Sequence, residues 1–167
     1  MPTELIAALE TLLSMPPLSY ALIAGGPKYP SIHGVVYFYP LWNGSFVMAE
    51  VSGLPIRDNL CPEAFFAFHI HQGNVFQGTE EDPFSQVGSH YNPYHCPHPS
   101  HAGDLPLLLG NEGYALSFFY TQSFHPLEVV GHTVIIHDKA DDYHSQPAGD
   151  SGAKIACGEI RANQWSY

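Results

Sequence analysis

Short runs of apolar, β-branched and aromatic residues recur along the chain from about residue 18 onward, and glycine, proline or asparagine separates them. Runs of this kind are typical of β-strands joined by turns. The dipeptide Asn43-Gly44, which lies between two such runs, indicates a hairpin turn. We therefore predict strands at 18–24, 32–39, 45–51, 65–71, 114–120, 129–137 and 155–160.

The first residues follow a different pattern. Between residues 3 and 14 the apolar side chains recur at helical spacing, Thr3 is a suitable N-cap, and Pro16 and Pro17 end the segment. This pattern predicts a short amphipathic helix that packs on the domain or on a partner subunit. Its expected apolar face comprises Leu5, Ile6, Leu9, Leu12 and Leu13. We accordingly divide the chain into a helical extension at 1–17 and a β domain at 18–167.

The composition supports one all-β domain and excludes some partners. The chain has 167 residues, and its 15 glycines and 15 prolines favour many turns between short strands. A formal charge of −11 with only 5 Lys and Arg residues argues against binding to nucleic acid. No apolar run is long enough to span a bilayer. Because the N-terminus lacks the basic start of a signal peptide, we expect a cytoplasmic protein.

Histidine is the unusual residue, with 11 copies in the chain. Because histidine is the commonest metal ligand, this excess predicts a metal site. His69 and His71 close an apolar strand, and the alternation of a strand places both imidazoles on one face. Two long segments without strand character, at 72–111 and 138–153, are expected to be functional loops.

The first of these loops contains a dense set of potential metal ligands: His90, His95, Cys96, His98, His101 and Asp104. Three imidazoles and one carboxylate form a suitable tetrahedral set for zinc. The alternative is a polar loop whose histidines are incidental. His137 closes another predicted strand, and by itself such a residue is more often a strand-end histidine than a ligand.

Together these segments resemble the Cu/Zn superoxide dismutases. The resemblance covers roughly residues 31 to 160 and rests on FHIH, GSHYNP, HAGDLP, LLGNEG, GHTVIIHDKADD and SGAKIACGEI, which occur in the family's order. It implies a Greek-key β-sandwich or flattened barrel of immunoglobulin-like architecture, with two long functional loops. It also implies the antioxidant activity of the family, an oxidoreductase acting on superoxide, and it allows a homodimer.

The resemblance assigns the ligands residue by residue. Copper would be bound by His69, His71, His90 and His137, and zinc by His90, His98, His101 and Asp104. His90 would thus bridge the two ions. His98 is preferred as the third zinc histidine because it has the family's distance from His90, but His95 and Cys96 stay open. Asp141 would link a copper histidine to a zinc histidine and fix their orientation.

The chain departs from the family at two places. Lys154 stands where the family has an arginine beside copper, so the charge is kept and the planar fork of donors is lost. The family also ties its long loop to the cysteine of the ACG motif, here Cys157, through a disulfide. The usual partner between His71 and His90 is absent. Cys61 or Cys96 could substitute, or Cys157 could stay reduced, in which case another support for the loop is expected.

The implied mechanism is alternate reduction and oxidation of copper, which converts two superoxide anions to dioxygen and hydrogen peroxide. His90 would release reduced copper and carry a proton to the product, while Lys154 would attract the anion; both are assigned as catalytic. Lys139 is a weaker candidate for attraction, and Glu80, Glu81 and Asp82 are interpreted as a solvated loop. The main alternative is a dismutase-like metal-binding protein without turnover, such as a copper carrier or a zinc-stabilised module. A copper-only dismutase and a structural β-sandwich are further alternatives.

Overall fold

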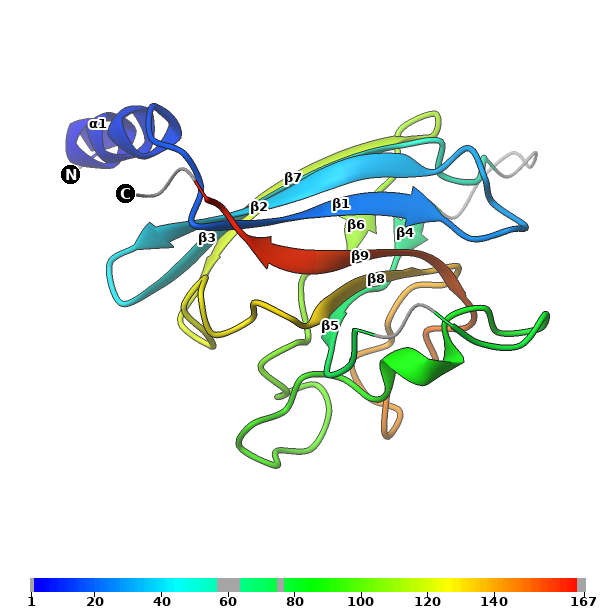
Figure 1. The fold of residues 1–167 in the computed structure, drawn as a ribbon. Helices are drawn as coiled ribbons and strands as arrows, with labels where there is room; N and C mark the ends of the chain where they lie inside the picture. The colour runs from blue at the N-terminus through cyan, green and yellow to red at the C-terminus, as the bar shows by residue number, and fades with distance from the viewer. Residues whose placement is uncertain (1, 57–63, 75–76, 165–167) are drawn as a thin grey trace.

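The computed structural model describes residues 2–56, 64–74 and 77–164 and has the predicted all-β fold (Figure 1). One antiparallel sheet has the strand order β5-β8-β9-β1-β2-β3-β7, and a small second sheet pairs β4 with β6. The strands are β1 (Ser19–Gly25), β2 (His33–Leu41), β3 (Gly44–Ser52), β4 (Phe65–Phe66), β5 (Phe68–His71), β6 (Leu108–Leu109), β7 (Tyr114–Thr121), β8 (Thr133–His137) and β9 (Lys154–Ala162).

The large sheet curls because its two ends are joined by the small one. β4 leads directly into β5 at one end, while β6 lies beside β7 at the other. The chain crosses between these ends after β3 and again after β7, as in a Greek-key barrel. The inner face forms one core cluster, with fully buried Val36, Phe38, Phe68, Ile136 and Ile160 among its members. Burial of such large side chains is the main stabilising contribution to the fold.

Several predicted boundaries need correction. Ala67 divides the strand predicted at 65–71, because its N–H and C=O bond to Lys139 and His137 instead of continuing one ladder. The strand predicted at 129–137 begins only at Thr133, and β6 was not predicted. The turn between β2 and β3 is formed by Trp42 and Asn43, since Leu41 already pairs with Gly44.

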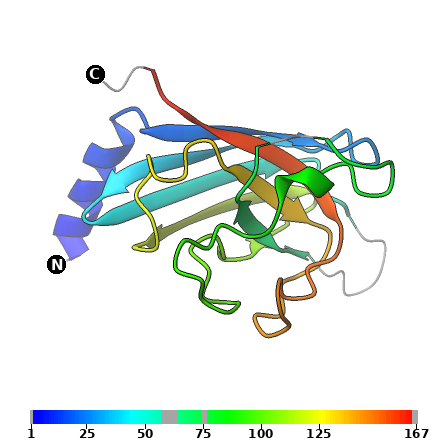
Figure 2. The same ribbon diagram turned by 60° about the horizontal axis from the view of Figure 1, so that its bottom comes forward.

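The predicted N-terminal helix is present as α1 (Pro2–Leu13). It packs on the outer face of β2 and β3 (Figure 2). There, buried Leu12 contacts Tyr39 and Phe46. The predicted apolar face was too wide, because Ile6 and Leu13 are exposed. Among the described residues, no helix has the length and hydropathy needed to cross a bilayer.

The two long loops lie together beside β5 and β8, away from α1 (Figures 1 and 2). The first contains a short 3-10 helix, η1 (Ser85–Val87). Every residue of β5 and of β8 is buried. A strand buried on both faces needs a cover on each, and here the core covers one face while the loops cover the other.

Candidate metal centre

The two histidines of β5 lie on the sheet face that the loops cover. Phe68 and Ile70 point into the core, so alternation places His69 and His71 on the opposite face. Both imidazoles are buried, although burial of an imidazole is costly unless its nitrogens find partners.

The first long loop runs along the free edge of β5 as an irregular strand. The N–H of Ile70 donates to the carbonyl of Gly103 at 2.9 Å, and the N–H of Tyr91 donates to the carbonyl of Ile70 at 2.7 Å. Bridges of this kind place His90 opposite His71 and Asp104 opposite His69. A side chain at Gly103 would collide with the carbonyl oxygen of Ile70, so the close approach requires glycine there.

Four histidines from three parts of the chain meet in this region. Ring nitrogens of His69, His71, His90 and His137 all lie within 4.8 Å of one another, and the four side chains are buried. The ring centroids of His69 and His90 are 4.0 Å apart, and those of His69 and His137 are 5.0 Å apart. One metal ion can be held by such a group, since imidazole ligands suit copper and zinc alike.

The hydrogen bonds of these rings fix which nitrogen faces the centre of the group. Nε2 of His69 lies 2.7 Å from the Asp141 carboxylate, and Nδ1 of His71 lies 2.7 Å from the Gly88 carbonyl. Nδ1 of His137 faces the Gly152 carbonyl at 3.3 Å. Because these oxygens only accept, each named nitrogen carries the proton and the other nitrogen keeps its lone pair.

The nitrogens left without a partner are the ones that a metal needs. His69 Nδ1, His71 Nε2, His90 Nε2 and His137 Nε2 are buried and form no hydrogen bond. A buried acceptor without a hydrogen-bond partner costs free energy. A shared cation accounts for four such nitrogens in one place. The residues therefore fit a metal ion at this position.

A second potential metal group shares one ring with the first. His90, His98, His101 and Asp104 offer ligand atoms within 4.8 Å of one another. His90 Nδ1 lies 2.7 Å from Asp104 Oδ1, and His98 Nδ1 lies 3.1 Å from Asp104 Oδ2 without hydrogen-bond geometry. Three imidazoles and a carboxylate match a closed zinc set. His90 thus presents Nδ1 to this group and Nε2 to the four-histidine group.

Of the three residues that the sequence offered as the third zinc ligand, only one lies in the second ligand group. The structure brings His98 into the group. His95 lies in the wall of the neighbouring cavity instead. The backbone of Cys96 is held by the amide of Asn92, and its thiol belongs to no ligand group among the described residues.

Asp141 joins the two groups from behind. Its carboxylate lies 2.7 Å from Nε2 of His69 and 2.9 Å from Nε2 of His98, and it also accepts the N–H of Tyr143. Gly149, with φ +69, lies so close that a side chain there would collide with this carboxylate. One buried carboxylate therefore fixes one ring in each metal group.

The environment favours neutral imidazoles. Burial, followed by the neighbouring His90 and His71, lowers the pKa of His69 to about 2. Burial and His69 lower the pKa of His137 to about 3, and burial also lowers the pKa of His71. For Asp104, burial raises the pKa, but hydrogen bonds from His90 and the His101 backbone outweigh it and lower the pKa overall. Deprotonated ligands of this kind are ready to bind cations.

A cavity of about 490 Å³ gives access to the four-histidine group, and its walls include His71, His90, His137 and Lys154. Lys154 owes its place to a β-bulge in β9, where the pairing with β8 shifts between Ile136 and His137. Since Ala156 faces the core, strict alternation would turn Lys154 toward the core as well. The extra residue that the bulge inserts in β9 turns the Lys154 side chain to the sheet face that carries the histidines, where Lys154 pairs with His137.

The lysines near the site have acidic partners. Nζ of Lys154 lies 2.7 Å from Oδ2 of Asp82. Nζ of Lys139 lies 3.6 Å from Asp150, and both of those side chains are largely exposed. The interpretation of Asp82 as a merely solvated loop residue was therefore wrong.

The loop is supported by an apolar cluster at Cys157. Phe84 and Val87 from the loop pack with Ile135 of β8 and Cys157 of β9, on the face that carries the histidines. Cys157 is a free thiol, as is Cys96, and burial raises the pKa of Cys157 to about 12. Cys61 lies outside the described residues. A packed cluster thus stands where the resemblance implied a covalent link.

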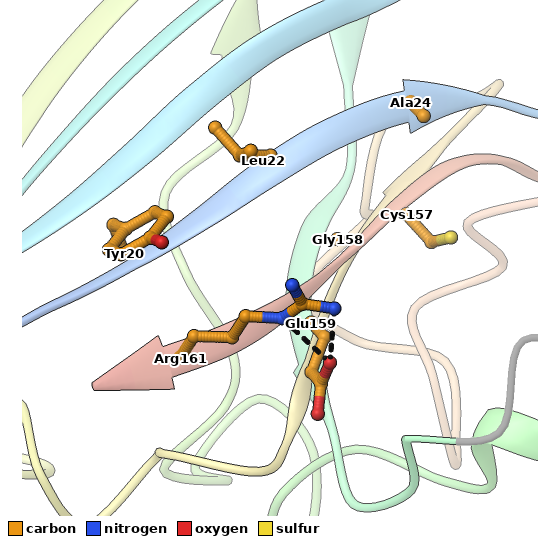
Figure 3. A pocket seen from close by; sticks show the side chains of 7 residues that line it. All are labelled: Tyr20, Leu22, Ala24, Cys157, Gly158, Glu159 and Arg161. Atoms are coloured by element: carbon orange, nitrogen blue, oxygen red, sulfur yellow. Dashed lines mark hydrogen bonds and ion pairs between the residues drawn. The ribbon is translucent and has the colours of Figure 1, made fainter. Parts of the chain in front are cut away.

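The outer face of the sheet also has a groove of about 370 Å³, between β1 and β9 (Figure 3). Cys157 lies at one end, and at the other the Arg161 guanidinium pairs with Glu159 at 2.9 Å. No metal-ligating group of the described residues includes any of its lining side chains.

Sequence reasoning missed two supporting residues. Gln146 of the second loop is hydrogen-bonded to His98 of the first. Its side chain accepts the N–H of His98 at 3.1 Å and donates to the His98 carbonyl at 2.6 Å. Asp82 binds Lys154. Neither lies in a motif with ligand spacing, so no local pattern in the sequence marks them.

The fold and the two groups define an all-β protein with two adjacent sets of potential metal ligands that share His90. Residues 32–160 match the family of copper/zinc superoxide dismutases (SODC), and the chain belongs to this family.

Relatives with similar sequences come from bacteria and from animals. The chain is 32% identical to a Cu-Zn superoxide dismutase of Deinococcus radiodurans over 149 residues, which cover 78% of each chain. It is 34% identical to the superoxide dismutase-like protein YojM of Bacillus subtilis over 134 residues, which cover 69% of this chain and 66% of that one. A crystal structure of a double mutant of a SOD-like protein from Bacillus subtilis has a TM-score of 0.68 at 25% identity, covering 86% of this chain and 97% of that one.

Proposed function

We propose that the protein is a superoxide dismutase that uses copper and zinc. The observation that carries this proposal is the His90 ring, whose Nδ1 faces the zinc-type set and whose Nε2 is an orphaned buried nitrogen beside three further orphaned nitrogens. We assign copper to His69, His71, His90 and His137, and zinc to His90, His98, His101 and Asp104. When bound, copper supplies one-electron exchange with superoxide, and zinc supplies a second positive charge.

The protein residues would orient the ligands and manage the proton. Asp141 holds His69 and His98 by their outer nitrogens, so both rings keep one tautomer. His90 lines the cavity, and we assign its Nε2 as the atom that carries a proton toward the peroxide product. Lys154 lines the same cavity and is assigned to the attraction of the superoxide anion.

The test is to load the protein with copper and zinc and to follow the decay of superoxide by pulse radiolysis. We expect catalytic decay in the wild type. Substitution of His90→Ala removes the shared ring, and we expect the rate to fall by at least about a hundredfold, in line with the loss of one positioned proton-transfer group. The conservative control Tyr94→Phe, at an exposed residue outside both ligand groups, should keep the wild-type rate. Bound copper and zinc without accelerated superoxide decay in the wild type would contradict the proposal.

A second candidate is a metal-binding protein without turnover. The ion pair between Lys154 and Asp82 favours it, because it offsets the charge of the lysine in the cavity wall. The same decay measurement separates the two candidates. Cytoplasmic location and a homodimer stay predictions; cell fractionation and the sedimentation velocity of the full chain test them.

A further inference from the structure

Lys154 is the one Lys or Arg residue among the described residues that line the 490 Å³ cavity, and its charge is already engaged. Its ammonium lies 2.7 Å from Oδ2 of Asp82, and the Lys154 side chain is only 17% exposed. The Asp82 side chain is 39% exposed, so the pair is shielded from solvent mainly at its lysine end and lies between a surface and a buried ion pair. An anion that approaches this cavity therefore meets a lysine that already has a carboxylate partner.

The carboxylate of Asp82 is held in place by its own turn. Oδ1 of Asp82 accepts the N–H of Phe84 at 3.1 Å, which leaves Oδ2 for Lys154. The carbonyl of Asp82 accepts the N–H groups of Thr79 and Ser85. Phe84 in turn belongs to the apolar cluster around Cys157. The loop thus reaches β9 at two neighbouring points, one apolar and one ionic.

We propose that Asp82 is a positioning residue that holds Lys154 against the cavity wall and regulates its attraction for anions. This inference rests on the proposed function, because it concerns the cation that draws superoxide to the site. An incoming anion must compete with the Asp82 carboxylate for the Lys154 ammonium. The pair consequently lowers anion affinity while it ties the ordered loop to the strand that carries Lys154.

The variant Asp82→Asn tests the proposal, because asparagine keeps the shape and can still accept the N–H of Phe84. The matched control is Glu81→Gln, which changes the net charge equally at an exposed neighbouring residue. The first readout is the acetylation rate of Lys154 in the metal-free protein, measured by mass spectrometry. We expect this rate to rise several-fold in Asp82→Asn and to stay unchanged in Glu81→Gln.

The second readout is azide affinity of the copper- and zinc-loaded protein, followed by optical titration at low and high salt. A unit negative charge about 6 Å from the bound anion changes affinity about threefold in a water-like dielectric, and salt screens the effect. Asp82→Asn should therefore bind azide at least about threefold more tightly at low salt, because release of Lys154 adds to the loss of this direct repulsion. The change in azide affinity of Glu81→Gln should be less than half as large. In a Lys154→Met background only the direct repulsion remains, so the gain from Asp82→Asn should fall to about threefold or less.

Equal acetylation in wild type and Asp82→Asn would overturn the proposal, as would azide affinity that is unchanged or weaker in Asp82→Asn. Neither readout requires turnover. A chain that fails to consume superoxide but shows the expected acetylation would contradict the proposed function alone, and an active chain with unchanged acetylation would contradict this inference alone.

Discussion

The substitution Phe84→Ala tests whether an apolar cluster secures the long loop. Phe84 is 7% exposed and packs with Val87, Ile135 and Cys157. Removal of a buried phenylalanine side chain usually costs about 3–5 kcal/mol. Because Phe84 lies at the edge of the fold and the loop can partly close the gap, we expect the lower end, about 3 kcal/mol.

The assay is thermal unfolding of the metal-free protein, since bound metal would break two-state behaviour. A loss of about 3 kcal/mol corresponds to a fall of about 6–12 °C in the melting temperature for a chain of this size. Hydrogen exchange at the N–H of Gly73, which bonds to the Val87 carbonyl at 2.7 Å, should also become faster. The control is Phe118→Ala, because Phe118 is 63% exposed and should cost less than about 1 kcal/mol. Equal losses in the two variants, with unchanged exchange at Gly73, would refute the reasoning.

Three further predictions concern pH, thiol reactivity and backbone approach. In the folded protein the pKa values of His69 and His137 are about 2 and about 3, whereas a histidine in the unfolded chain has a pKa of about 6.5. Below that pH the unfolded chain therefore binds more protons than the folded one. The free energy of unfolding of the metal-free protein should fall between pH 7 and pH 5 by about 2 kcal/mol for each histidine. Thermal unfolding between pH 7 and pH 5 checks this prediction, and a melting temperature that does not change with pH would contradict it. With a pKa of about 12, Cys157 is a thiolate in only about one molecule in ten thousand at pH 8, so iodoacetamide should modify it only after unfolding. Gly103→Ala should push the loop away from Ile70 and weaken zinc binding in competition with a chromophoric chelator, whereas unchanged affinity would show that the close approach is dispensable.

Local patterns in the sequence predicted most strands and the pair on β5. Alternation alone places His69 and His71 on one face, since that feature depends only on the geometry of an extended chain. The loop that carries His90 offered several possible ligands; the family's spacing favoured His98, while His95 and Cys96 stayed open. The choice depends on the path of the backbone along β5, which long-range hydrogen bonds determine.

Other features that the sequence did not reveal have the same origin. The bulge opposite His137 inverts the alternation of β9, and nothing in the run Lys154 to Ile160 marks it. The acid run at 80–82 has an ordinary surface composition, yet the turn at Asp82 and the place of Lys154 bring a carboxylate and an ammonium together. The helical spacing of α1 predicted a wide apolar face, but only the side that meets Tyr39 and Phe46 is covered.

The central claim is that the ring of His90 lies between two different metal ions. Anomalous diffraction at the copper and zinc absorption edges, from crystals of the protein loaded with both metals, tests it most directly. We predict copper beside Nε2 of His90, among His69, His71 and His137, and zinc beside Nδ1 of His90, with Asp104 as its carboxylate ligand. A single ion, or two ions of which either lacks His90 as a ligand, would contradict the account.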